Sequence, residues 1–151
     1  MLFQGPNPRP RKRKMLKLDQ IVEFMDMIRG SPYGEYQIWI NLKTDETEVY
    51  NELFTPSEER EEFRHDNAPE WILFRPEIYD SNIIESFIAT VNDGGLRDLM
   101  HDIFQGRGKY RRIKTYFARS GFLDRFYRYE TEYVRNAAIE WCKTSGVPFR
   151  E

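Results

Sequence analysis

A basic segment that joins two glycines to a predicted helix is the strongest candidate for chemistry in this sequence. Two glycines let the backbone approach a ligand or adopt positive φ, and the amides at a helix N-terminus favour an anion. Guanidinium and ammonium groups add charge-assisted contacts to phosphate. The segment therefore predicts a site for the phosphates of nucleic acid, RNA or DNA, with a tyrosine available for stacking. The candidate binding residues are Gly106, Arg107, Gly108, Lys109, Tyr110, Arg111, Arg112 and Lys114.

Helical geometry divides this segment into two faces. In a helix that begins near Lys109, Arg111 and Lys114 lie near one face with Arg107 close by. Tyr110, Ile113 and Phe117 are expected to point to the core. The spacing matches neither a Walker phosphate loop nor a dinucleotide fingerprint. An alternative is that the arginines pair with the acidic part of the chain and that Gly-Arg-Gly is only a turn between helices.

The residues for enzyme chemistry are weaker candidates. The pairs His65-Asp66 and His101-Asp102 resemble ligands of a hydrolytic metal ion, but two such dipeptides arise easily by chance in an acidic chain. Cys142 follows a tryptophan late in a predicted helix, which favours a structural thiol over a nucleophile. The sequence predicts no catalytic residue, metal or cofactor, and we expect a binding protein rather than an enzyme.

Charge is distributed unevenly along the chain. The whole sequence has 23 basic and 25 acidic residues, a net charge of −2. Residues 19–104 hold 20 acidic and 6 basic residues, whereas residues 105–151 hold 5 acidic and 11 basic residues. The two parts either neutralise each other or meet different partners. The second case supports an alternative function, in which the acidic surface of residues 19–104 binds a basic protein, as in an immunity or adaptor protein.

Length and composition favour one folded domain or two small ones. The chain has 151 residues, of which 40% are hydrophobic and 15% aromatic, enough for a core. No apolar run reaches the roughly 20 residues of a membrane-spanning helix, and no signal-peptide pattern is visible. We therefore expect a cytoplasmic protein with no membrane partner. The single cysteine excludes an intramolecular disulfide and a Cys-based structural zinc site.

The first residues differ in character from the rest. Residues 2–6 read Leu-Phe-Gln-Gly-Pro, a viral protease recognition sequence typical of cloning vectors. Residues 7–17 then carry six basic and no acidic side chains. We expect residues 1–14 to be a cloning remnant plus a basic disordered arm, whose last residues are either native or added. Residues 15–151 are expected to form one α+β domain.

The N-terminal half is predicted to hold a helix and a small sheet. Asp19 is a plausible N-cap for a helix that ends near Arg29. A hairpin is expected over residues 35–53, with alternation that buries Tyr36, Ile38, Ile40 and Leu42 on one face. A short acidic helix is expected over residues 57–64 and a third strand over residues 71–74. The sheet should therefore be mainly antiparallel.

The C-terminal half is predicted to be helical. A helix capped by Asn82 should end before Asn92, and a second should carry the apolar residues from Leu96 to Phe104. A third should end at Gly121, and the last and longest should cover about residues 124–144. The predicted fold class is thus α+β: an N-terminal helix, about three mainly antiparallel strands, and a helical C-terminal half.

Parts of this sequence resemble a bacterial family of unknown function. Leu96-Arg97 and the run from Gly106 to Lys114 match its Gly-Arg-Gly, aromatic, Arg-Arg pattern, and Gly121-Phe122-Leu123 and the ending 138–142 support the match. The chain is thus similar to Uncharacterised Protein Family zero-one-five-eight over about two thirds of its length. The resemblance implies a bacterial cytoplasmic protein with mixed helices and strands, and no known activity. His101 stands where the family usually has an aliphatic residue, which disfavours a family-wide catalytic role.

Overall fold

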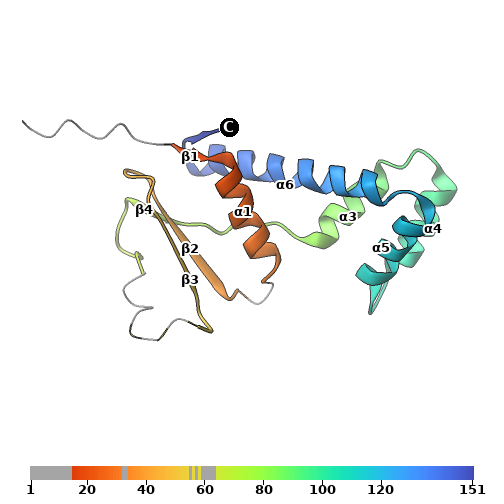
Figure 1. Ribbon diagram of the computed structural model, residues 1–151, viewed down its shortest axis with the longest axis horizontal. Helices are drawn as coiled ribbons and strands as arrows, with labels where there is room; N and C mark the ends of the chain where they lie inside the picture. Colours follow the sequence, from red (N-terminus) through yellow and green to blue (C-terminus); the bar gives the residue numbers. More distant parts are fainter. Residues whose placement is uncertain (1–14, 32–33, 55, 57, 59–63) are drawn as a thin grey trace, which may run out of the picture. The chain divides into compact units, whose positions relative to one another are not determined.

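The computed structural model describes residues 15–31, 34–54, 56, 58 and 64–151 of the chain. Helices dominate the C-terminal half and a small antiparallel sheet follows the first helix, which confirms the predicted α+β class (Figure 1). In chain order the elements are β1 (Leu16–Lys17), α1 (Leu18–Arg29), β2 (Tyr36–Asn41), β3 (Thr47–Asn51), β4 (Trp71–Leu73), α3 (Asp80–Ala89), α4 (Gly94–Ile103), α5 (Lys109–Ser120), α6 (Leu123–Ser145) and β5 (Phe149–Arg150).

The chain divides into two units. The first unit comprises the described part of Met1–Pro76 together with Cys142–Glu151. The second unit comprises Glu77–Trp141, so that the division falls within α6. Each unit has its own buried side chains, and we describe them separately.

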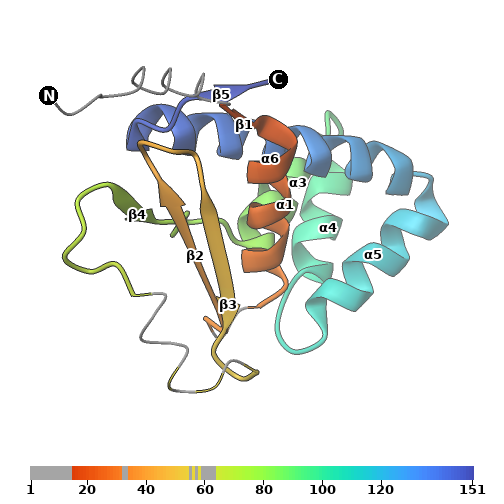
Figure 2. The ribbon, with the colours of Figure 1, turned by 60° about the vertical axis from the view of Figure 1, so that its left-hand side comes forward.

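A three-stranded antiparallel sheet and α1 build the first unit (Figure 2). The strand order is β3-β2-β4, with Ile38 opposite Val49 and Ile40 opposite Ile72. Helix α1 is amphipathic, and its ring of Phe24 lies 5.8 Å from the ring of Phe74, which directly follows β4. The predicted hairpin and third strand are therefore confirmed.

The central strand β2 is buried on both faces. The predicted alternation placed Trp39 and Asn41 on a polar, solvent-facing side, and this prediction is wrong, because both residues are buried. The rings of His65 and Trp71 cover this side at Trp39. Asn41 accepts hydrogen bonds from the first backbone amides of the hairpin turn, so its burial leaves no unpaired acceptor.

Two predicted helix caps are wrong. Lys17 is extended because it belongs to β1, so α1 begins immediately after it and Asp19 lies within the first turn. Helix α3 begins at Asp80, two residues before Asn82, the predicted cap. Of the acidic helix predicted over residues 57–64, the structure describes only residues 58 and 64, so this prediction lies largely outside the described residues.

A pair of short parallel strands, β1 and β5, joins the two separate segments of the first unit. Leu16 lies opposite Phe149, and Lys17 lies opposite Arg150. The Arg150 guanidinium also donates to the Met15 carbonyl at 3.3 Å. The sequence pattern did not predict these strands, because two residues are too short for a periodic signal.

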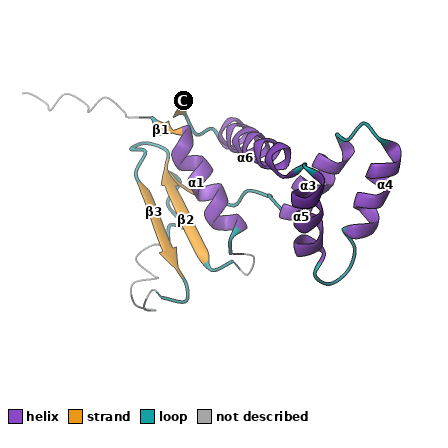
Figure 3. Ribbon diagram, turned by 45° about the vertical axis from the view of Figure 1, so that its right-hand side comes forward, coloured by secondary structure: helices purple, strands orange, loops and turns teal. Residues whose placement is uncertain are grey.

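The second unit is helical (Figure 3). Aromatic rings form its centre. The rings of Phe87 from α3, Phe117 from α5 and Phe126 from α6 contact one another, with centroids between 5.1 and 5.3 Å apart. All three side chains are buried. Edge-on and tilted ring contacts of this kind add to the free energy of burial. The core therefore fixes α5 through its apolar face.

Candidate functional site

Both glycines of the Gly-Arg-Gly turn adopt a backbone conformation that other residues rarely reach. Gly106 has φ of 70° and Gly108 has φ of 77°. A Cβ on Gly108 would also lie 3.2 Å from Nη1 of Arg112. Gly108 is the N-cap of α5 and brings no side chain to the amides of the first turn. The turn thus needs glycine for geometric reasons, and it leaves the helix N-terminus uncovered by a cap.

The structure gives Arg112 a role within the turn. Its Nη1 donates to the Arg107 carbonyl at 2.6 Å, and its Nη2 donates to the Gln105 carbonyl. Two charge-assisted hydrogen bonds hold the turn against the first coil of α5. Arg112 therefore positions the segment that carries Arg107, and its guanidinium is already engaged by backbone carbonyls.

Three other cations extend from the turn and helix into solvent. Arg107, Arg111 and Lys114 are exposed, as predicted from the helical spacing. Within Glu77–Trp141, all of which the structure describes, none of the three forms an ion pair with a carboxylate. The three side chains are therefore free of ion pairs within their own unit, which holds ten acidic and ten basic residues in total.

Lys109 and Tyr110 make a small aromatic cluster with Phe104. The Lys109 ammonium lies 4.5 Å from the Phe104 ring centroid, and the Tyr110 ring packs edge-on against Phe104 at 5.3 Å. The prediction that Tyr110 points to the core is wrong, because its side chain is 41% exposed. It lies in the first turn of α5, where it contacts Phe104 but extends past the buried residues Ile113 and Phe117.

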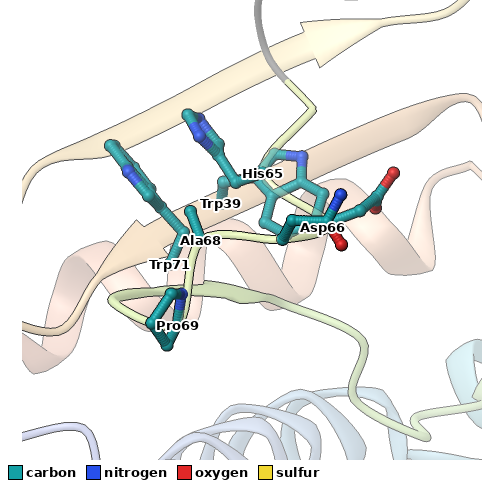
Figure 4. Close-up of a pocket in the computed structure, with 7 residues that line it drawn as sticks. Trp39, His65, Asp66, Ala68, Pro69 and Trp71 are labelled. Atoms are coloured by element: carbon teal, nitrogen blue, oxygen red, sulfur yellow. The ribbon is translucent and has the colours of Figure 1, made fainter.

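The sequence reasoning missed an aromatic pocket in the first unit (Figure 4). Trp39, Trp71 and the loop from His65 to Pro69 line an open pocket of about 420 Å³. The His65 ring stacks on Trp71 at 4.0 Å with an angle of 8° between planes, and meets Trp39 edge-on at 5.4 Å. The sequence did contain one signal for this pocket, which is Trp39. A tryptophan on the polar side of an alternating strand must be shielded from solvent by another part of the chain.

A carboxylate fixes the histidine of this pocket. Nε2 of His65 lies 2.6 Å from Oε2 of Glu48 on β3. This contact ties the loop after the sheet to the hairpin. His65-Asp66 and His101-Asp102 belong to different units, and among the described residues no group of three metal-ligating side chains occurs.

Cys142 is buried where α6 enters the first unit. Desolvation raises the pKa of its thiol from 9.0 to about 11. Because the thiolate is the reactive form, burial makes Cys142 a poor nucleophile at neutral pH.

Comparison with protein-family models, curated proteins and solved structures found no match to this chain. The resemblance to Uncharacterised Protein Family zero-one-five-eight stays a prediction that rests on the residues quoted for it. Among the described residues, no helix combines the length and the apolar character needed to cross a membrane.

Proposed function

We propose that this protein binds nucleic-acid phosphates through α5 and the Gly-Arg-Gly turn, without catalysing a reaction. The observation that carries the proposal is the charge of α5, which contains five basic and no acidic residues. A helix of this kind attracts a polyanion, and each phosphate that it neutralises releases condensed counterions.

The geometry of α5 suits a phosphate backbone. With about 3.6 residues per turn, Arg111, Thr115 and Ala118 lie on the side of the helix opposite the buried Ile113 and Phe117. Thr115 and Ala118 are small, and Lys114 and Arg119 flank them; all four side chains are exposed. A nucleic-acid strand can therefore approach the helix closely, while the Lys114 and Arg119 side chains reach phosphates on both sides.

The turn adds a second group of contacts to the same binding mode. The exposed Arg107 side chain lies between two glycines, and the bonds from Arg112 hold its backbone in place. Tyr110 offers a partly exposed ring beside this turn. Phosphate contacts from α5 combined with base stacking on Tyr110 would favour single strands over duplexes.

The test compares binding of fluorescent single-stranded RNA, duplex RNA and duplex DNA at near-physiological salt. The variant is Arg111→Glu with Lys114→Glu, because reversing Arg112 would also disturb the turn. We expect its affinity to fall about tenfold or more, and the slope of log affinity against log salt to become shallower by about two.

A matched control separates local contacts from net charge. Lys43→Glu with Arg75→Glu changes the net charge equally, and both residues are exposed in the first unit. This control should bind nearly as well as the unaltered protein, and circular dichroism should show both variants folded. Equal losses in the two variants, or no binding by the unaltered protein at micromolar concentration, would refute the proposal.

A second candidate function is binding of a basic protein by the acidic surface of residues 19–104. Leu53 and Phe54 follow the hairpin and are 69% and 83% exposed, beside the exposed Glu52. Apolar side chains next to carboxylates are typical of protein interfaces. Neutralising Glu58, Glu59, Glu61 and Glu62 should weaken such a complex and leave nucleic-acid binding intact, whereas Arg111→Glu with Lys114→Glu should do the reverse.

A further inference from the structure

We propose that the pocket formed by Trp39, His65 and Trp71 binds the ammonium group of an organic cation, such as a quaternary ammonium. This inference is independent of the nucleic-acid proposal, because the pocket lies wholly in the first unit. Its volume of about 420 Å³ falls within the range of small-molecule sites, roughly 300–1,000 Å³.

The ring arrangement gives the pocket two aromatic walls. His65 and Trp71 are parallel, and Trp39 meets His65 at 79° (Figure 4). His65 and Trp71 cover one face of each other at 4.0 Å, and Trp39 is 5% exposed, so a ligand meets only the parts of the three rings that line the pocket. Aromatic rings arranged around a cation attract it through their negative faces, and quaternary ammonium groups are the ligands that use this attraction most fully.

The polar groups of the pocket favour a positive ligand. Among the described residues, the lining includes the acidic residue Asp66 and neither lysine nor arginine. A second carboxylate, that of Glu48, lies 2.6 Å from Nε2 of His65. Residues 15–76 and 142–151 together hold 15 acidic and 8 basic residues, and residues 1–14 of the same unit add five basic residues. The acidic excess therefore belongs to the part of the unit that contains the pocket.

The Arg64 guanidinium competes with a bound cation for the carboxylate of Asp66. Its Nη2 lies 3.1 Å and its Nε 3.2 Å from Oδ2 of Asp66, and both side chains are more than half exposed. An exposed pair of this kind is weak, so a bound cation can replace the guanidinium. Removing Arg64 should therefore strengthen binding, whereas removing the charge of Asp66 should weaken it.

Choline and its uncharged isostere, 3,3-dimethylbutan-1-ol, are the probes. The chain has three tryptophans, of which two line the pocket, so the indole resonances of Trp39 and Trp71 should move on titration while Trp141 serves as the internal reference. We expect millimolar binding of choline, and binding of the alcohol that is weaker by about threefold or more.

The variants make opposite predictions. Asp66→Asn should weaken choline binding by about threefold, and Arg64→Ala should strengthen it by a similar factor. Trp71→Ala should abolish binding, because it removes the aromatic ring from the pocket. Trp71→Phe keeps an aromatic ring and should retain part of the binding, which shows that the loss in Trp71→Ala is not caused by unfolding. A short peptide that contains trimethyllysine, tested beside choline, distinguishes a protein side chain from a free small molecule as the source of the cation.

Three results would overturn the proposal. Equal binding of choline and the alcohol would identify a plain apolar pocket. Shifts at Trp141 equal to those at Trp39 and Trp71 would show nonspecific association. Absence of any shift at 50-fold excess over about 1 mM protein would show that the pocket does not take an ammonium group.

Discussion

At the scale of single residues, Arg112 determines the shape of the candidate interface. Its guanidinium bonds to two carbonyls of the turn, so Arg112→Ala removes two charge-assisted hydrogen bonds at once. Because the side chain is exposed, we expect a loss of about 1 kcal/mol in the free energy of unfolding, less than buried bonds of this type would cost. Urea denaturation followed by circular dichroism measures this loss.

The neighbouring arginine is the control for this substitution. Arg111 is exposed and forms no ion pair within its unit, so Arg111→Ala should change stability by less than about 0.5 kcal/mol. Arg112→Lys should recover only part of the loss, because an ammonium group cannot reach both carbonyls in the fork geometry. Similar losses for Arg111→Ala and Arg112→Ala would contradict the assigned role.

The exposure of individual candidate residues could be predicted only where helical periodicity applies. Arg111 lies on the face opposite Ile113 and Phe117, and Lys114 lies on the flank of that face; both are exposed, as their spacing predicts. The engagement of Arg112 by the turn could not be predicted, because it depends on the backbone path of residues 105–108, which periodicity does not describe. The pocket also escaped prediction, since His65 meets Trp39 only after the chain has folded back on the sheet.

At the scale of elements, Asp93 fixes the start of α4. Its carboxylate accepts a hydrogen bond from the Leu96 amide at 3.0 Å, and the two glycines that follow lie within the helix. A helix that begins with two glycines has a weak first turn, so it depends on its cap. Asp93→Ala should lower the free energy of unfolding by about 1 kcal/mol and speed amide exchange in the first turn of α4.

Two substitutions check that the effect comes from the cap. Asp93→Asn keeps the acceptor oxygen and should retain most of the stability. Asn92→Ala changes the exposed neighbour, which is outside the helix, and should have little effect. If Asn92→Ala proves as destabilising as Asp93→Ala, the side-chain cap is not what stabilises α4.

Elements with a strong periodic signal were predicted well, and their boundaries less well. Helices α5 and α6 and strands β2 to β4 occur close to their predicted positions. The cap predicted at Asn82 failed because a residue of capping type can equally lie within the first turn. The sequence predicted that the preceding helix ends before Asn92, but it predicted no cap at Asp93, where α4 begins.

At the scale of the whole molecule, the chain contributes two distant segments to one unit. Residues up to Pro76 and from Cys142 onward share the first unit, and Glu77–Trp141 forms the second. The β1–β5 pair is a direct link between those segments. No local pattern could reveal this arrangement, because it depends on pairing between residues more than 130 positions apart. We therefore expect a substitution that destabilises β1 to raise the accessibility of the Cys142 thiol.

Labelling of Cys142 tests this coupling. At pH 8, the raised pKa of about 11 leaves about one native thiol in a thousand as thiolate, against about one in ten for the ordinary value of 9.0. The thiol is also only 1% exposed, so a thiol reagent should react mainly with molecules in which the first unit has opened.

Leu16→Ala removes a buried side chain from β1 and should lower the free energy of this opening by about 2 kcal/mol. Labelling should then accelerate about thirtyfold, since 1.4 kcal/mol corresponds to a factor of ten. Lys17→Ala, at the exposed position of the same strand, should leave the rate nearly unchanged, and an equal rate in both variants would show that β1 does not hold the C-terminal segment in place.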